Sequence, residues 1–281
     1  MSAMVSQSVS AASSPGGRLI VAPAHAAASA ALAAAGWEHL DDLFAVDGAE
    51  WLDKASLPPW RQRLRIELPG LGIVYLKRYS APPWGEQLRR MLSADWRRST
   101  AAVEWARMQA LAEAGIAAVE PVALGQEMIG PWERRSAVVT AAVPGESLER
   151  RAGRAKNRAS REMVNSLARF VARFHGAGFV HRDLYLSHVF VEDRGGKPQF
   201  WLIDLARVFA PRHRQRRWMV KDLAALDYST PRSAATSTDR MRFIKTYLGF
   251  NHLSPTHKRF IRQVIRKSMR IARHDAARNQ P

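Results

Sequence analysis

The spacing of apolar and polar positions changes along the chain, from alternation in the first half to a helical period in the second. Residues 61–68 alternate apolar side chains with charged ones, which is typical of a half-buried strand. The Pro-Gly-Leu-Gly turn at 69–72 and the apolar run 73–79 extend it into a predicted β-hairpin with Lys77 on its second strand. Further extended segments are expected at 43–46 and 138–143.

Apolar positions three and four residues apart predict helices elsewhere in the chain. One helix is expected over 100–114, capped by Ser99 or Thr100 and ended by Gly115, with Glu104 on its otherwise apolar side. Other helices are predicted over 25–35, 162–175, 218–226, 239–248 and 255–273.

The order of these elements predicts a mixed α+β fold in two lobes. Strands dominate before Pro144 and helices after it, and ligand sites commonly form in the cleft between such lobes. We expect a leader at 1–36 that is disordered to about residue 24 and Ala-rich beyond it. A lobe at 37–143 and a lobe at 144–281 that ends in a basic helix follow the leader.

Two aspartates flank a predicted hairpin in the second lobe. Asp183 precedes its first strand and Asp204 ends its second, and a Gly-Gly turn at 195–196 brings both acids to one edge. Two converging acids can hold Mg²⁺, or one can hold the metal while the other orients a hydroxyl nucleophile. With Lys77 as a cation for phosphates and Glu104 as its anchor, these are the parts that phosphoryl transfer needs.

Three short motifs resemble those of protein kinases, and they follow one another along the chain in the same order as in that family. His-Arg-Asp-Leu at 181–184 resembles the catalytic loop, and Val-Tyr-Leu-Lys at 74–77 resembles the lysine strand. Leu-Ile-Asp-Leu at 202–205 stands where the metal-binding Asp-Phe-Gly motif would be. The resemblance implies a two-lobed protein-kinase-like fold, with an antiparallel sheet and helix C in the N-lobe and a mainly α-helical C-lobe. It also implies ATP and Mg²⁺ as cofactors.

A finer resemblance is to the lipopolysaccharide kinase family, the core heptose kinases and their Kdo-kinase relatives. The run His-Arg-Asp-Leu-Tyr-Leu-Ser-His at 181–188 is similar to the His-Arg-Asp-x-Tyr-x-x-His run of that family. Segments 203–207 and 221–226 resemble two further family segments, and the resemblance covers residues 40–250. It implies ATP-dependent phosphorylation of a sugar hydroxyl, on heptose or Kdo, in the lipopolysaccharide core or a related glycolipid.

The resemblance assigns expected roles to individual residues. Asp183 is expected to orient the acceptor hydroxyl, and Asp222 to anchor the catalytic loop through its backbone. Arg207 has two open interpretations, contact with the acceptor or with a neighbouring acid. The expected site residues are Asp183 and Arg182 for catalysis, Lys77, Glu104, Gly70 and Gly72 for the nucleotide, and Asp204 and His188 for the metal.

Two features depart from the protein-kinase pattern. Five residues after Asp183 the chain has His188 where protein kinases have Asn, and a neutral imidazole can either ligate a metal or serve as a hydrogen-bonded core group. The glycine turn at 69–72 is shorter than a G-x-G-x-x-G loop, so the nucleotide is expected to depend more on Lys77 and the metal.

The charge of the chain predicts a polyanionic partner. It has 43 Lys and Arg against 25 Asp and Glu, a net charge of +18, and no Cys, which excludes disulfides, thiol nucleophiles and Cys-based zinc sites. Basic runs at 150–158 and 207–217 flank the predicted cleft, and the last helix has a basic face that can meet lipid phosphates while its apolar face packs. These features favour a phosphorylated glycolipid acceptor and peripheral contact with an anionic membrane, at the inner face of the cytoplasmic membrane.

Other functions remain open at this level. A kinase-fold enzyme with a protein or small-molecule acceptor is one alternative. A catalytically inactive kinase-like module that binds a membrane is another, suggested by the short glycine turn but opposed by the presence of Lys77, Asp183 and Asp204 together. Nucleic acid is not an expected partner because the sequence has no zinc finger or RNP motif.

Overall fold

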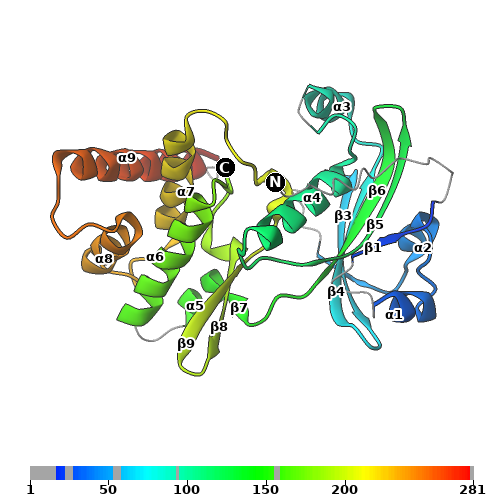
Figure 1. The fold of residues 1–281 in the computed structure, drawn as a ribbon, viewed down its shortest axis with the longest axis horizontal. Helices are drawn as coiled ribbons and strands as arrows, with labels where there is room; N and C mark the ends of the chain where they lie inside the picture. The colour runs from blue at the N-terminus through cyan, green and yellow to red at the C-terminus, as the bar shows by residue number, and fades with distance from the viewer. Residues whose placement is uncertain (1–16, 23–27, 53–57, 93–94, 155–158, 279–281) are drawn as a thin grey trace, which may run out of the picture. The chain divides into compact units, whose positions relative to one another are not determined.

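The computed structural model describes residues 17–22, 28–52, 58–92, 95–154 and 159–278. The chain divides into two compact units, which are considered separately below (Figure 1). The first unit comprises Met1–Ala106 and Glu120–Ala142, and the second comprises Arg107–Val119 and Val143–Pro281.

A six-stranded sheet forms the centre of the first unit, and every neighbouring pair in it is antiparallel. The hairpin predicted from the alternating pattern is confirmed, with Lys77 on its second strand. In sheet order the strands are β1 (Ile20–Val21), β5 (Pro121–Ile129), β6 (Trp132–Ala141), β4 (Gly72–Ser80), β3 (Arg61–Leu68) and β2 (Glu50–Trp51).

Helices α1 (Ala28–Ala34) and α2 (Leu40–Ala45) supply side chains to an apolar core shared with the sheet. The expectation of an extended segment at 43–46 is wrong, because α2 occupies most of it. The physical reason is local, since the Asp42 carboxylate accepts hydrogen bonds from two backbone N–H groups before the helix and thereby caps it. The core includes Leu32, Leu40 and Leu43 from the helices and Leu64, Leu76 and Val139 from the sheet.

The expectation of a disordered leader does not hold for residues 17–22. Ile20 and Val21 pair with Leu124 and Ala123 of β5, so that these two residues form one of the two edge strands of the sheet. The predicted short helix before Gly36 is confirmed as α1. Residues 1–16 and 23–27 lie outside the described part of the chain.

Two helices follow the lysine strand. The predicted helix over 100–114 is confirmed as α4 (Thr100–Glu113), which is capped by the Ser99 hydroxyl accepting from the Ala102 N–H at 3.1 Å. Gly115 adopts a φ of +67° just beyond it. Helix α3 (Trp84–Met91) is not predicted by the sequence, because its segment has the composition of a basic connection.

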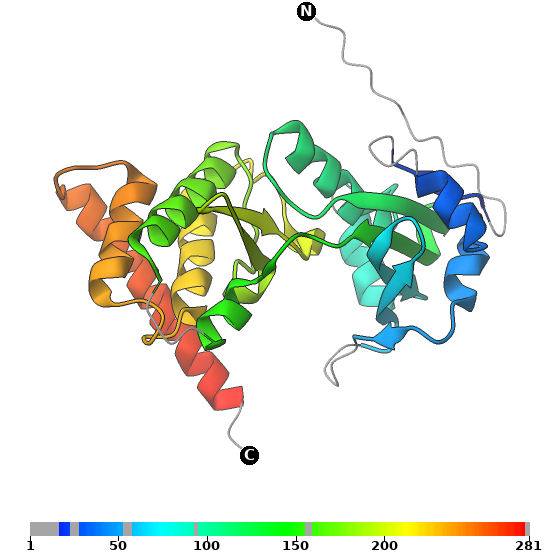
Figure 2. The ribbon, with the colours of Figure 1, turned by 90° about the horizontal axis from the view of Figure 1, so that it is seen from below.

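The second unit is mainly helical, with one small antiparallel sheet (Figures 1 and 2). Helix α6 (Arg161–Gly176) packs on α8 (Ser237–Leu248), and α7 (Gln215–Ser229) packs on α9 (Pro255–Arg278). Helix α6 also contacts the sheet, where the Phe170 and Phe200 rings lie 5.7 Å apart. None of the described helices combines the length and apolar character needed to cross a bilayer. The elements are β7 (Glu146–Ser147), α5 (Leu148–Arg154), α6 (Arg161–Gly176), η2 (Leu186–His188), β8 (Val189–Arg194), β9 (Lys197–Leu202), η3 (Leu205–Arg207), α7 (Gln215–Ser229), α8 (Ser237–Leu248) and α9 (Pro255–Arg278).

Candidate active site

The first unit holds a buried ion pair on the lysine strand. Val74 and Leu76 of β4 belong to the core beneath α1 and α2, so strand alternation places Lys77 and Tyr79 on the opposite face. There the Lys77 Nζ donates to Glu104 Oε1 of α4 at 2.5 Å, and the Tyr79 hydroxyl donates to Glu104 Oε2 at 3.0 Å. The side chains of Lys77 and Glu104 are 14% and 1% exposed. The expected contact between Lys77 and Glu104 is therefore present, and its lysine is the more accessible partner.

Gly70 and Gly72 are not brought to this ion pair. Both have positive φ, +82° and +70°, and they form the tight turn between β3 and β4. Gly72 begins the strand five residues before Lys77, which corresponds to about 16 Å at the usual rise of an extended strand. The nearest neighbour of a Cβ at Gly70 would be Ala31 of α1. These glycines therefore lie in a turn at a distance along the strand from Lys77, and their contact with the nucleotide stays a prediction.

In the second unit, the predicted hairpin is present as β8 and β9, with Val189 paired to Leu202 at its base. Asp183 comes before that base and Asp204 after it, so the strand register brings their segments to one end of the hairpin. His188 connects the two segments. Its Nδ1 is 2.8 Å from the Asp183 backbone oxygen, and its Nε2 is 3.9 Å from Asp204 Oδ2. Asp204 has a φ of +55°, in the left-handed region.

The contacts of His188 determine its tautomer. A carbonyl oxygen only accepts, so the neutral ring must carry its proton on Nδ1, which leaves a lone pair on Nε2. The Nε2 atom that carries this lone pair is 3.9 Å from Asp204 Oδ2, a distance that is too long for a hydrogen bond. A histidine held this way through Nδ1 is the usual arrangement of a metal-ligating imidazole.

These residues fit Mg²⁺ better than a metal held entirely by protein. Among the described residues there is no group of three or more His, Cys, Asp or Glu placed to hold a metal ion. Mg²⁺ usually binds through one or two protein groups together with waters and substrate phosphates, rather than in a complete protein cage. The pair of Asp204 and His188 matches that smaller requirement.

Two cations lie beside the Asp183 carboxylate. Arg207 Nη1 is 2.7 Å from Oδ2, and Lys221 Nζ of α7 is 3.8 Å from Oδ1. Arg207 thus makes the contact with a neighbouring acid that was one of its two interpretations, and its contact with the acceptor stays a prediction. Burial lowers the pKa of the Lys221 ammonium group, and Asp183 partly opposes that effect. Sequence reasoning missed Lys221 as a site residue, although its place immediately before Asp222 was a usable signal.

A further aspartate, Asp222, is fully buried and holds the loop that carries Asp183. The Asp222 carboxylate accepts from the backbone N–H of His181 at 2.6 Å and from that of Arg182 at 2.7 Å. The expected role of Asp222 as a backbone anchor is thus confirmed. Arg182 has a φ of +71°, and its guanidinium lies over the Trp218 ring at 5.3 Å from the centroid. Arg182 therefore contributes to the geometry of the loop, and its catalytic role stays a prediction.

The antiparallel sheet with its lysine strand and acid-bearing helix, followed by a helical unit with two aspartates at a hairpin base, defines a protein-kinase-like fold. Residues 66–247 match the model of the lipopolysaccharide kinase (Kdo/WaaP) family, and the chain belongs to that family. Both the predicted fold class and the predicted family are confirmed.

Individual relatives agree with this assignment. The chain is 32% identical over 199 residues to the lipopolysaccharide core heptose(I) kinase WaaP of Pseudomonas aeruginosa, a match that covers 66% of this chain and 73% of the relative. It is 30% identical over 199 residues to the enzyme of the same name from Escherichia coli K12, covering 67% and 75%. Among solved structures, WaaP in complex with acyl carrier protein has a TM-score of 0.67 at 24% identity, covering 90% of this chain and 98% of that one.

Proposed function

We propose that this protein transfers a phosphoryl group from ATP to a hydroxyl of heptose or Kdo in the lipopolysaccharide core. The observation that carries the proposal is the arrangement at the base of the β8–β9 hairpin, where Asp183, His188 and Asp204 lie together. Family membership supports the acceptor class, since the curated relatives are named as core heptose(I) kinases. The side chains themselves support phosphoryl transfer without specifying the sugar.

In the proposed mechanism Asp183 orients the acceptor hydroxyl and accepts its proton as the hydroxyl oxygen bonds to the γ-phosphorus of ATP, while the bond from that phosphorus to the bridging oxygen breaks and ADP leaves. Arg207 holds one oxygen of that carboxylate at 2.7 Å, and Lys221 lies at a longer 3.8 Å from the other, which leaves this second oxygen for the hydroxyl. Asp222 fixes the loop through the N–H groups of His181 and Arg182. Asp183 is therefore held in position by contacts on several sides.

The remaining groups are proposed to serve the nucleotide. Asp204, with the Nε2 lone pair of His188, would hold Mg²⁺, which when bound neutralises charge on the phosphates. Lys77, positioned by Glu104, would contribute a second positive charge to the phosphates. The functional lobes at 37–143 and 144–281 are part of this proposal, with the lysine in the first and the acids in the second.

The acceptor class implies a location. We propose that the enzyme works at the inner face of the cytoplasmic membrane, in peripheral contact with an anionic lipid surface. The support is electrostatic, because the net charge is +18 and helix α9 exposes a row of basic side chains. The exposed basic residues of α9 include Lys258, Arg259, Arg262, Arg266, Arg270 and Arg273.

A cavity in the second unit suggests a further apolar ligand. It has a volume of about 600 Å³ and is lined mainly by apolar side chains of α6 to α9, including Met163, Leu167, Leu226, Phe243 and Val264. We propose that it takes an acyl chain, and acyl carrier protein, the partner in the solved WaaP structure, is a candidate donor. The lining supports this proposal, whereas the likeness to that structure supports only the fold.

Mass spectrometry tests the function directly. The core saccharide from a strain that lacks this protein should have lost one phosphate, and the purified protein with labelled ATP and Mg²⁺ should restore it. Transfer of label to protein or to a small molecule, but not to the saccharide, would reject the proposed acceptor. For the cavity, native mass spectrometry with an added fatty acid should show binding that Leu167→Trp, which fills the space, removes.

A further inference from the structure

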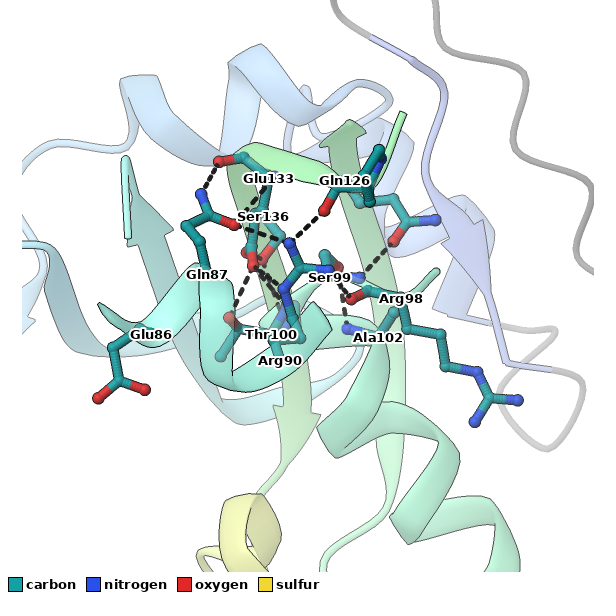
Figure 3. Close-up of polar contacts among 12 residues, drawn as sticks. Glu86, Gln87, Arg90, Arg98, Ser99, Thr100, Ala102, Gln126, Glu133 and Ser136 are labelled. Atoms are coloured by element: carbon teal, nitrogen blue, oxygen red, sulfur yellow. Dashed lines mark hydrogen bonds and ion pairs between the residues drawn. The ribbon is translucent and has the colours of Figure 1, made fainter. Parts of the chain in front are cut away.

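Helix α3 in the first unit is held in place through its polar side (Figure 3). The Gln87 amide is buried and donates to the Glu133 backbone oxygen at 2.7 Å. Arg90 donates to the backbone oxygens of Pro131 at 2.5 Å and Trp96 at 3.1 Å, and its Nε is 3.6 Å from the Glu133 carboxylate. The inner side of the helix is therefore fixed by hydrogen bonds and an ion pair.

Glu133 also ties the next helix to the same point. Its carboxylate is completely buried and accepts from the Thr100 N–H at 2.8 Å, from the Thr100 hydroxyl at 2.7 Å and from the Ser136 hydroxyl at 2.5 Å (Figure 3). One buried acid on β6 thus fixes the start of α4 and the inner side of α3. Because buried networks of this kind are rigid when fully bonded, the outward face of α3 is presented in a defined orientation.

The outward face of α3 is apolar, which reverses the usual arrangement of a surface helix. Trp84, Leu88 and Leu92 follow one another at intervals of four residues and are 67%, 43% and 80% exposed. Trp84 lies against Trp132, their ring centroids 5.3 Å apart, at the turn where Ile129 is 62% exposed. These five residues form what we call the α3 patch. Contiguous exposed apolar side chains on a folded protein generally mark an interaction site.

Arginines adjoin the α3 patch in sequence. Arg97 is exposed and lies over the Trp96 ring at 4.4 Å from its centroid, and Arg98 is exposed and pairs with Asp95 at 3.3 Å. Arg89, on α3 itself, pairs with Glu86. Trp and Leu side chains beside Arg are the combination that settles at the boundary between lipid headgroups and acyl chains.

We propose that the α3 patch docks the protein onto an anionic lipid bilayer, with Trp84, Leu88 and Leu92 entering the interface. Charge complementarity favours this occupant, since a chain of net charge +18 is attracted to anionic lipids and repelled by a second copy of itself. This inference names the surface that would make the membrane contact of the proposed function, and it rests on that proposed function. Its test needs no turnover, so the two can fail separately.

Vesicle flotation tests the proposal with the full chain. Vesicles of phosphatidylethanolamine and phosphatidylglycerol, at high salt to screen the basic helix α9, should carry the protein, and Leu88→Ser/Leu92→Ser should lower the bound fraction about tenfold or more. The matched control is Leu52→Ser/Leu253→Ser, which removes two leucine side chains that are 36% and 40% exposed and lie outside the α3 patch and the cavity of the second unit. The control should float like the unmodified chain. Both changes are at exposed positions, and equal melting temperatures would show that folding is unaffected.

Three outcomes would overturn the proposal. The α3 variant could float as well as the unmodified chain, or the unmodified chain could fail to float on any of these vesicles. Alternatively, analytical ultracentrifugation could show a dimer that Leu88→Ser/Leu92→Ser dissociates, which would assign the α3 patch to self-association. A second readout separates docking from chemistry, because the variant should phosphorylate a delipidated core saccharide normally and a vesicle-embedded acceptor poorly.

Discussion

The two groups of charged residues that we assign to phosphoryl transfer differ in how tightly their members hold one another. In the first unit, Lys77 and Glu104 meet at 2.5 Å, and Tyr79 occupies the other carboxylate oxygen. In the second, Arg207 is 2.7 Å from Asp183, but the separations are 3.9 Å from His188 to Asp204 and 3.8 Å from Lys221 to Asp183. We call the first the closed group and the second the open group. Changes in the closed group should therefore lower stability, whether or not they lower activity, and changes in the open group should lower activity with stability nearly unchanged.

The largest expected effect is the loss of Asp183. Asp183→Ala should lower turnover about a thousandfold, equivalent to about 4 kcal/mol, because it removes the group that receives the hydroxyl proton. Its melting temperature should stay close to that of the unmodified chain, since the carboxylate is partly exposed and its cationic neighbours can be hydrated. Steady-state kinetics and calorimetry measure the two quantities.

Asp193→Ala is the matched control for Asp183→Ala. Asp193 lies on β8 and also pairs with an arginine, Arg151, but it is far along the strand from the hairpin base. Full turnover is expected in this control. If Asp183→Ala retained full activity, Asp183 would have no place in the mechanism.

The next effect concerns the closed group. Lys77→Met should lower the free energy of unfolding by about 3 kcal/mol, because it leaves the buried Glu104 carboxylate without its cation. The double variant Lys77→Met/Glu104→Gln should recover most of that stability, because it also removes the buried negative charge. Denaturant unfolding measures the free energy of unfolding of both variants. Neither variant should catalyse phosphoryl transfer. If the double variant were both stable and active, Lys77 would be a structural residue only.

The parts of the fold and of the candidate site that could be predicted from the sequence are those whose sequence signals act over a few residues. The hairpin with Lys77, the helix of Glu104 and the hairpin between Asp183 and Asp204 follow from alternation, capping and a Gly-Gly turn, all of which act over a few residues. The anchoring role of Asp222 followed from the family resemblance and is confirmed by two backbone hydrogen bonds.

What could not be predicted depended on distant partners. Nothing near α3 in the sequence indicates that Gln87 and Arg90 would find Glu133, some forty residues later, and so turn the apolar side of the helix outward. The strand at Ile20–Val21 is two residues long and exists because β5 offers an edge. The contact of Lys221 with Asp183 depends on the packing of α7, so the place of Lys221 beside Asp222 could mark it as a site residue but could not give its partner.

A smaller effect is expected at the open group when His188 is changed. His188→Phe should weaken Mg²⁺ binding about tenfold, because the Nε2 lone pair beside Asp204 is lost. It also removes the hydrogen bond from Nδ1 to the Asp183 backbone oxygen, while the ring and its stacking on His181 are kept. Titration with Mn²⁺ as a paramagnetic probe, in the presence of nucleotide, measures the change. Unaltered affinity would make His188 a core histidine that positions the Asp183 loop, the alternative interpretation of this residue.

The smallest effect is expected at Tyr79, and it sharpens the contrast between the two groups. Tyr79→Phe removes one donor to Glu104 at 3.0 Å and should lower the free energy of unfolding by about 1 kcal/mol, because a buried carboxylate oxygen loses its partner. Turnover should change little, since Lys77 still holds Glu104 through its other oxygen.

The open group offers a matched change in Arg207→Gln, which removes the 2.7 Å contact to Asp183 at a partly exposed position. That variant should show the reverse pattern, with stability nearly unchanged and turnover reduced. If both variants altered stability and turnover to the same extent, the distinction between a closed and an open group would not hold.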